Sequence, residues 1–135
     1  RLLFVLFAED RHLLPVEEPR YREYGLRDPV RLHAAERIDG GAPFSDTRAN
    51  YWNHALGLFA AIAEGDRASG LPPYNGGLFD AAATPALQRA KIPDSVFGPV
   101  IDRLGRIDDP RGGRRYVNYR DLSVQQLGSI YERLL

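Results

Sequence analysis

The sequence predicts a mainly α-helical fold, an irregular helical bundle with long proline- and glycine-containing loops and at most one short strand or hairpin. Apolar residues recur at steps of three and four over residues 52–63, which is the period of one helix face. The chain also has 13 glycines and 10 prolines, residues that end helices and form turns. Only Tyr116–Tyr119 has the composition of a strand.

The first predicted helix spans Leu2–Leu14, because its apolar run is nearly continuous and Pro15 stops it. A helix that is apolar on most sides is expected to be buried. A second, short helix is predicted from about Val30 to Ile38 and is closed by Gly40-Gly41.

The clearest helix follows Ser45, with Ser45 or Asp46 as its N-cap and Gly65 at its C-terminal end. The apolar residues of its predicted buried face are Trp52, Ala55, Leu56, Phe59, Ile62 and Ala63. Residues 70–80 then form a compact loop, in which Asn75-Gly76 supplies a tight turn.

Two further helices are predicted before the basic region of the chain. Thr84-Pro85 opens a short helix that runs to about Ala90, since proline is favoured at the first helical position. Pro93–Leu104 forms the other helix, and Gly98-Pro99 either kinks it or marks its true start.

The last helix begins with a capping box formed by Ser123 and Gln126. Leu122 and Leu127 have the spacing of a hydrophobic staple across this first turn. The buried stripe of the helix is predicted to contain Leu127, Ile130, Tyr131 and Leu134.

Composition limits the class of protein. The 18 basic and 18 acidic residues give zero net charge, whereas dedicated nucleic-acid binders usually carry a positive excess. The absence of cysteine excludes disulfides, thiolate metal sites and thiol nucleophiles from this sequence. The longest apolar run, Leu2–Ala8, is far shorter than the roughly 20 residues of a membrane-spanning helix. We therefore expect a cytoplasmic protein with no membrane partner.

No arrangement of residues predicts a catalytic, cofactor-binding or metal-binding site. Pro93-Asp94 resembles the start of a nuclease motif, but the only lysine, Lys91, precedes it. Leu71–Tyr74 resembles the catalytic loop of amino-methylating DNA methyltransferases, but leucine cannot accept the hydrogen bond that this loop makes to the target amino group. The histidines at positions 12, 33 and 54 are too far apart for a local metal motif. The sequence thus predicts no enzymatic activity for this chain.

The one local basic cluster surrounds two adjacent glycines. The arginines of this cluster are Arg106, Arg111, Arg114, Arg115 and Arg120. Flexible glycines beside arginines can follow a phosphate backbone, so these residues are candidate DNA phosphate contacts. Asp108, Asp109 and Asp121 partly cancel the charge, and a solvated loop is the alternative interpretation.

Three stretches carry a family resemblance: Leu2–Pro15 (LLFVLFAEDRHLLP), Tyr74–Asp80 (YNGGLFD) and Tyr119–Glu132 (YRDLSVQQLGSIYE). In this order they resemble the helical segment that precedes the methyltransferase core in type IIG restriction–modification enzymes and related phage-defence N6-adenine DNA methyltransferases. The resemblance implies that residues 1–135 form a single helical connector (spacer) domain excised from a larger chain. Its implied partners are the neighbouring domains and, in the full protein, DNA.

The same resemblance implies where the chemistry of the parent protein lies. S-adenosylmethionine, and Mg where a nuclease is present, would bind the parent outside this fragment, which itself holds no cofactor. Within the fragment the matching positions imply packing and turn roles: Phe7 and Leu14 in the core, Asn75, Gly76 and Gly77 in a turn, Phe79 as its anchor, and Tyr131 at the exit to the methyltransferase. The alternative is a stand-alone helical protein-interaction module without a nucleic-acid role.

Overall fold

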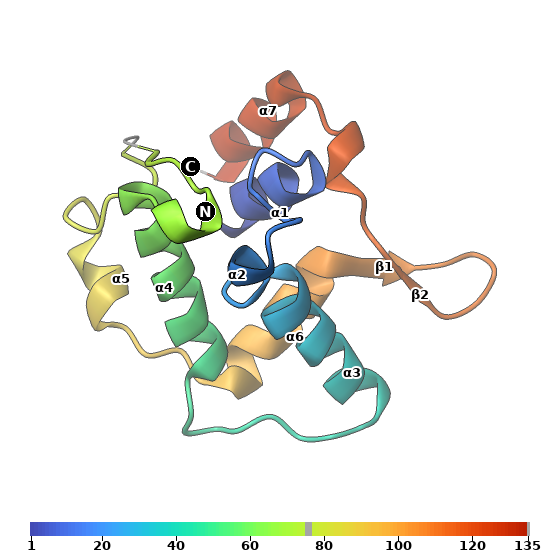
Figure 1. The fold of residues 1–135 in the computed structure, drawn as a ribbon. Coiled ribbons are helices and arrows are strands. Elements are labelled where there is room, and N and C mark those ends of the chain that lie inside the picture. Colours follow the sequence, from blue (N-terminus) through green and yellow to red (C-terminus); the bar gives the residue numbers. More distant parts are fainter. Residues whose placement is uncertain (75–76, 135) are drawn as a thin grey trace.

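Helices dominate the fold, and one short hairpin projects away from them (Figure 1). The computed structural model describes residues 1–74 and 77–134, and the side chains of Tyr131 and Leu134 lie outside this description. The helical elements are α1 (Leu2–Asp10), α2 (Pro19–Arg22), η1 (Arg27–Leu32), α3 (His33–Asp39), α4 (Asn50–Glu64), η2 (Arg67–Ser69), α5 (Pro85–Arg89), α6 (Asp94–Gly105), η3 (Tyr119–Asp121) and α7 (Val124–Leu134). The predicted mainly α-helical class is confirmed.

Helix α1 is buried as predicted but ends earlier than the sequence indicated. Residues Val5 to Glu9 are buried, whereas the helix stops at Asp10 and does not continue to Leu14. His12 adopts a left-handed conformation with φ 55°, and the N–H of Leu13 donates to the carbonyl of Ala8 at 2.8 Å. This pattern is a Schellman ending, in which a left-handed residue satisfies the last helical carbonyls. The sequence stays apolar beyond the end of the helix because Leu14, which follows the turn, is also buried in the core.

The predicted helix near Val30 begins earlier, as the π-helical turn η1, and continues into α3. The N–H of Arg31 donates to the carbonyl of Leu26 at 2.7 Å, a bond that spans five residues instead of the four of an α-helix. Gly40 forms the C-cap of α3, as predicted.

Helix α4 has the predicted buried face but a different N-terminal cap. Trp52, Ala55, Phe59 and Ile62 are buried, and Gly65 follows the last residue with φ 79°. The helix starts at Asn50, however, and the Ser45 hydroxyl accepts hydrogen bonds from Thr47 and Arg48 in the preceding turn. Ser45 and Asp46 were therefore the wrong caps, because the chain needs one more turn before the helix begins.

The cap of α4 comes from the start of helix α6. The Asp94 carboxylate, 7% exposed, accepts the N–H of Tyr51 at 2.9 Å. In return the N–H groups of Asp94 and Ser95 donate to the carbonyls of Arg48 and Ser45. The two helix starts thus satisfy each other's backbone groups, a long-range solution that local sequence does not display.

Helices α5 and α6 occupy their predicted positions. Thr84 precedes α5, although its hydroxyl accepts a hydrogen bond from Arg1 and caps no helical N–H. Helix α6 starts at Asp94 and runs through Pro99, so Gly98-Pro99 is not its start. A Cβ at Gly98 would lie 2.8 Å from the Phe44 ring, which explains why glycine precedes this internal proline.

The region after α6 forms a short hairpin, in keeping with the one short strand or hairpin that the predicted fold class allows. Strands β1 (Arg106–Asp108) and β2 (Arg114–Tyr116) pair antiparallel, with Arg106 opposite Tyr116. The predicted strand Tyr116–Tyr119 overlaps β2 only at Tyr116, and η3 follows. Gly112 and Gly113 have φ values of 105° and 73°, which lets the chain reverse tightly between the strands.

The start of α7 matches the sequence prediction in detail. The N–H of Gln126 donates to the Ser123 hydroxyl at 3.0 Å, and the N–H of Ser123 donates to the Gln126 side-chain oxygen at 2.9 Å. This reciprocal pair confirms the capping box. Leu127 is buried and Ile130 is half-buried. The predicted role of Tyr131 and the Asn75-Gly76 turn lie outside the described residues.

The hydrophobic core forms around α4 and includes residues of α1 and of the loop that contains Phe79. Phe79 is buried, and its ring lies 5.5 Å from Phe4 and 5.7 Å from Phe59 between centroids, as expected for the anchor of its loop. Phe7 and Leu14 are buried as well. Within the described residues, none of the helices has the length and apolar character needed to cross a bilayer.

The Asp94 cap yields a direct test of the fold. Asp94→Ala should lower the free energy of unfolding by about 1.5–3 kcal/mol, because a buried helix terminus loses a charge-assisted hydrogen bond. The measurement is urea unfolding followed by circular dichroism. Asp46→Ala, at an exposed position, is the matched control and should change stability by less than about 0.5 kcal/mol. Equal effects of the two substitutions would contradict the cap.

Candidate anion-binding cleft

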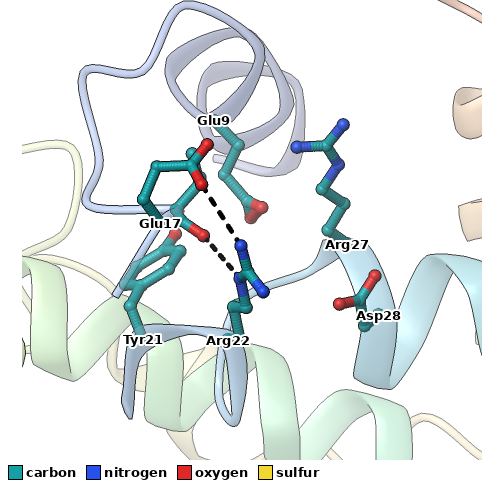
Figure 2. A pocket seen from close by; sticks show the side chains of 8 residues that line it. Glu9, Glu17, Tyr21, Arg22, Arg27 and Asp28 are labelled. Atoms are coloured by element: carbon teal, nitrogen blue, oxygen red, sulfur yellow. Dashed lines mark hydrogen bonds and ion pairs between the residues drawn. The ribbon is translucent and has the colours of Figure 1, made fainter. Parts of the chain in front are cut away.

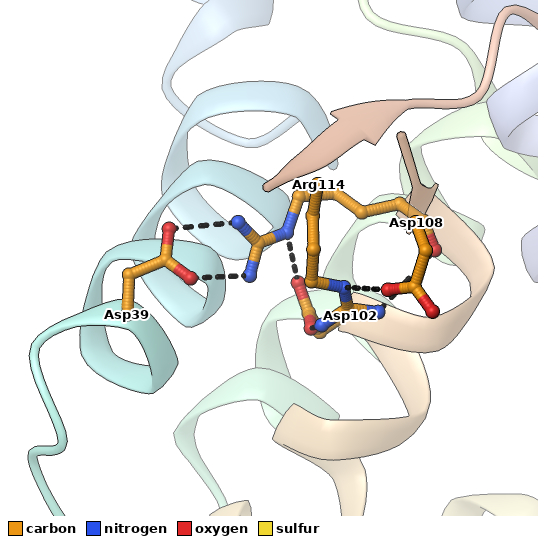
Figure 3. Close-up of polar contacts among 5 residues, drawn as sticks. Asp39, Asp102, Asp108 and Arg114 are labelled. Carbon is orange, nitrogen blue, oxygen red and sulfur yellow. Dashed lines mark hydrogen bonds and ion pairs between the residues drawn. The ribbon is translucent and has the colours of Figure 1, made fainter. Parts of the chain in front are cut away.

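An ion-pair network centred on Asp102 fastens the hairpin to the helices (Figure 3). Asp102 is 2% exposed and binds two arginines: Arg106 Nε at 2.6 Å and Arg114 Nη1 at 2.5 Å. The remaining Arg106 nitrogens donate to both carboxylate oxygens of Asp39, at 2.7 and 3.0 Å. This two-pronged geometry is the strongest form of an arginine–carboxylate contact.

The network fixes the charge state of its members. Hydrogen bonds from Arg106 hold the pKa of Asp39 below its usual value. The same bonds, together with those to Asp102, raise the pKa of the Arg106 guanidinium. Every nitrogen of the 6%-exposed Arg106 therefore has a carboxylate partner.

These contacts correct the sequence interpretation of two arginines. A phosphate could reach Arg106 only by displacing a carboxylate, and Arg114 donates to Asp102 and to the Arg106 carbonyl. Both residues are structural here. Arg111 and Arg115 remain exposed at the hairpin, where they border a shallow depression with Asp109, and Arg120 lies in a separate cleft.

That cleft, which we call the arginine cleft, lies where η1, the end of α1 and the segment after β2 meet. Its volume is about 270 Å³, and the lining residues that carry its charge and shape are Arg27, Arg31, Arg120, Asp10, Tyr116 and Asn118. Three arginines face one aspartate, so the cleft is positively charged although the whole chain is neutral. Arginines gathered on a concave surface suit an anionic ligand.

Arg31 is the unusual residue of the arginine cleft. It is 6% exposed, yet none of the ion pairs among the described residues includes it, and its Nε has no hydrogen-bond partner among them. Its guanidinium carbon lies 4.8 Å from the centroid of the Tyr116 ring. A buried charge with so few protein partners is costly unless water or a ligand in the cleft supplies the missing contacts.

The stem of Arg31 is held in place by the backbone of α6. A Cβ at Gly105 would lie 2.8 Å from Arg31 Cδ and 2.9 Å from Cγ, so only glycine leaves room for this side chain. With Gly105 against its stem and Tyr116 under its guanidinium, Arg31 is fixed before any ligand arrives. Such preorganisation reduces the entropy that binding costs.

The end of α1 positions the segment that carries Arg120. Asp10 accepts the N–H of Tyr119 at 2.9 Å, which engages the one aspartate of the arginine cleft. Arg11 donates to the carbonyls of Arg120 and Leu122, both at 3.1 Å. The Tyr119 hydroxyl donates to the carbonyl of Leu104 at 2.7 Å. Arg120 thus enters the cleft from a segment tied to both α1 and α6.

Glu9, on the same helix as Asp10, is a second carboxyl close enough to Arg31 for their charges to interact. Desolvation raises the pKa of Glu9, and the neighbouring positive charge of Arg31 only partly opposes this rise. None of the ion pairs among the described residues joins Glu9 to Arg31.

The sequence did not indicate Arg27 and Arg31 as site residues, because they lie about ninety positions before Arg120 in the chain and meet it only in the folded structure. One signal was present: Arg27 and Arg31 are four residues apart in a helical segment, a spacing that places two side chains near each other. The same spacing links Asp102 to Arg106 and could have indicated their ion pair.

Comparison of this chain with protein-family models, with curated proteins and with solved structures finds no match.

The Asp102 network can be tested by unfolding. Asp102→Asn should lower the free energy of unfolding by about 3 kcal/mol or more, because Arg106 stays buried and loses its ionised partner. Asp108→Asn is the control, since Asp108 is 95% exposed and 3.7 Å from Arg114. It should cost at most about 1 kcal/mol. A small effect of Asp102→Asn in urea denaturation would show that the network does not hold the hairpin.

Proposed function

We propose that this chain is a helical spacer that contacts the DNA backbone through its arginine cleft. The spacer joins an N-terminal region, a nuclease in some enzymes of the type it resembles, to an S-adenosylmethionine-dependent N6-adenine DNA methyltransferase core. The parent is a cytoplasmic restriction–modification or phage-defence enzyme, and the spacer itself performs no catalysis. The observation that carries the DNA contact is the buried Arg31, which has no carboxylate partner among the described residues.

Phosphate is the ligand class that best matches the arginine cleft. The guanidinium group presents a planar set of donors that fits phosphate oxygens, and three arginines converge there. Arg111 and Arg115 are further exposed basic residues outside the cleft, on the projecting hairpin beside Asp109. A backbone contact of this kind positions DNA without selecting a sequence, as expected of a spacer.

The spacer role is supported by the way the first helix is joined to the approach to α7. Asp10 and Arg11, at the end of α1, together make three hydrogen bonds to residues 119–122. These bonds link segments more than a hundred residues apart in the chain. A unit tied together in this way can hold the domains attached to it at a constant separation.

The phosphate contact predicts a specific salt dependence of DNA binding. The double variant Arg27→Gln/Arg120→Gln should weaken binding of a short duplex, because two arginines no longer neutralise phosphates. The slope of log affinity against log salt should fall by about one unit for each of these arginines. The measurement is fluorescence anisotropy at several NaCl concentrations.

The matched control is Arg89→Gln/Arg103→Gln, which removes the same charge from exposed positions on α5 and α6. It should leave the slope nearly unchanged. Arg31→Met, which keeps the length of the stem and removes the charge, should weaken binding without lowering the melting temperature. Equal losses of affinity in both double variants, or no loss in either, would reject the arginine cleft as the contact.

The place of the chain within its enzyme is tested by the parent gene. A glycine-rich cofactor loop followed by Asn-Pro-Pro-Tyr downstream of Leu135 supports the spacer. A stop codon directly after Leu135 removes that role and leaves the stand-alone interaction module.

A further inference from the structure

A second pocket, the Glu9 pocket, shares a wall with the arginine cleft. It has a volume of about 260 Å³, and Arg27 lines both. Figure 2 shows that the Glu9 carboxylate lies between Arg22 and Glu17 on one side of the pocket and Arg27 and Asp28 on the other. Ligand pockets for drug-sized molecules are usually about 300–1,000 Å³, so the Glu9 pocket suits a smaller group.

Two deeply buried polar groups line the Glu9 pocket and lack a full set of partners. Glu9 is 2% exposed, and its Oε1 accepts the N–H of Leu26 at 2.8 Å. Tyr21 is 1% exposed, and burial together with the nearby charge of Glu9 raises the pKa of its hydroxyl. This hydroxyl therefore lies close to Glu9 but has no hydrogen bond of good geometry among the described residues. A buried hydroxyl without a partner costs free energy, which a ligand that bonds to it would recover. The pocket is therefore built for a group that both donates and accepts hydrogen bonds.

One ion pair and one close backbone contact shape the walls of the Glu9 pocket. Arg22 donates to Glu17 at 3.2 Å and to the carbonyl of Val16 at 2.9 Å, which holds this side of the mouth in place. A Cβ at Gly25 would lie 2.9 Å from the Tyr21 ring, so the ring packs directly on bare backbone. Because Arg22 and Glu17 pair with each other, the remaining charged residues of the lining are Glu9, Asp28 and Arg27.

We propose that the Glu9 pocket and the arginine cleft together bind one unpaired nucleotide, with an amino-bearing base facing Glu9 and Tyr21 and its phosphate at Arg27 and Arg31. The base amino group donates to the Glu9 carboxylate, and the Tyr21 hydroxyl donates to a ring nitrogen. The phosphate half rests on the proposed function, whereas the base half rests on the Glu9 pocket alone. Unstacked bases are recognised in this manner, by hydrogen bonds to their exposed edges.

A base and a phosphate of this kind are present both in a free mononucleotide and in an unpaired residue of a DNA strand. Titration calorimetry with deoxyadenosine monophosphate, deoxythymidine monophosphate and inorganic phosphate tests the site. We expect deoxyadenosine monophosphate to bind at least about tenfold more tightly than deoxythymidine monophosphate, which has no exocyclic amino group. A single-stranded oligodeoxyadenylate is compared in parallel. Tighter binding of the oligonucleotide identifies a strand as the source, and tighter binding of the monomer identifies a free nucleotide.

Two isosteric variants separate the base contact from folding. Glu9→Gln and Tyr21→Phe should each weaken binding of deoxyadenosine monophosphate by about three- to tenfold. Neither should lower the melting temperature, because the first removes a buried charge and the second a hydroxyl without a hydrogen bond of good geometry. Binding of inorganic phosphate should not change. A purely structural role predicts the reverse: a lower melting temperature and unchanged nucleotide affinity.

The outcomes distinguish this proposal from the proposed function. If deoxyadenosine and deoxythymidine monophosphates bind equally, or if Glu9→Gln and Tyr21→Phe have no effect, the base site is wrong. Duplex binding that still depends on Arg27 and Arg120 would then leave the phosphate contact intact. Unchanged binding of both duplex and nucleotide by Arg27→Gln/Arg120→Gln would overturn both.

Discussion

The buried carboxylate of Asp102 is the constraint on which the arginine cleft depends. It lies one turn before the end of α6 and binds Arg106 at the start of β1 and Arg114 at the start of β2. The hairpin therefore leaves α6 in a fixed direction, and Tyr116, two residues beyond Arg114, is placed under the Arg31 guanidinium. A buried ion pair contributes little net stability, but it selects one arrangement over others. Here it selects the arrangement that forms the arginine cleft.

The sequence predicted what depends on neighbours in the chain and missed what depends on distant partners. The buried face of α4 and the Ser123–Gln126 capping box follow from local periodicity and spacing, and both are present. The cap of α4 comes instead from Asp94, more than forty positions away, and no local pattern displays it. Likewise the left-handed His12 ends α1 inside an apolar run, because tertiary packing of Leu14 outweighs the helical preference of that run.

In the candidate site, too, the features that depend on distant partners were missed from the sequence. The sequence pattern of residues 106–120 showed where arginines gather in the chain, but it did not separate arginines paired with carboxylates from unpaired ones. Pairing makes that separation: Asp102 and Asp39 engage Arg106, and Asp102 also engages Arg114, while Arg120 joins Arg27 and Arg31 across the fold. A chain with no net charge can therefore present a positive cleft, because its acidic residues balance the total without lying beside every arginine. Net charge describes the average field, whereas a ligand meets the local one.

The five-residue hydrogen bond of η1 also has an evolutionary consequence. A π-turn is an α-helix that has gained one residue, and here that residue lies within the segment that carries Arg27 and Arg31. Deleting a single residue would restore regular winding and rotate everything upstream by about 100° around the axis. Arg27 would then leave the wall between the two pockets, while the helix itself would persist. Length variation by one residue at this turn is thus a means by which related chains could gain or lose the site without changing their fold.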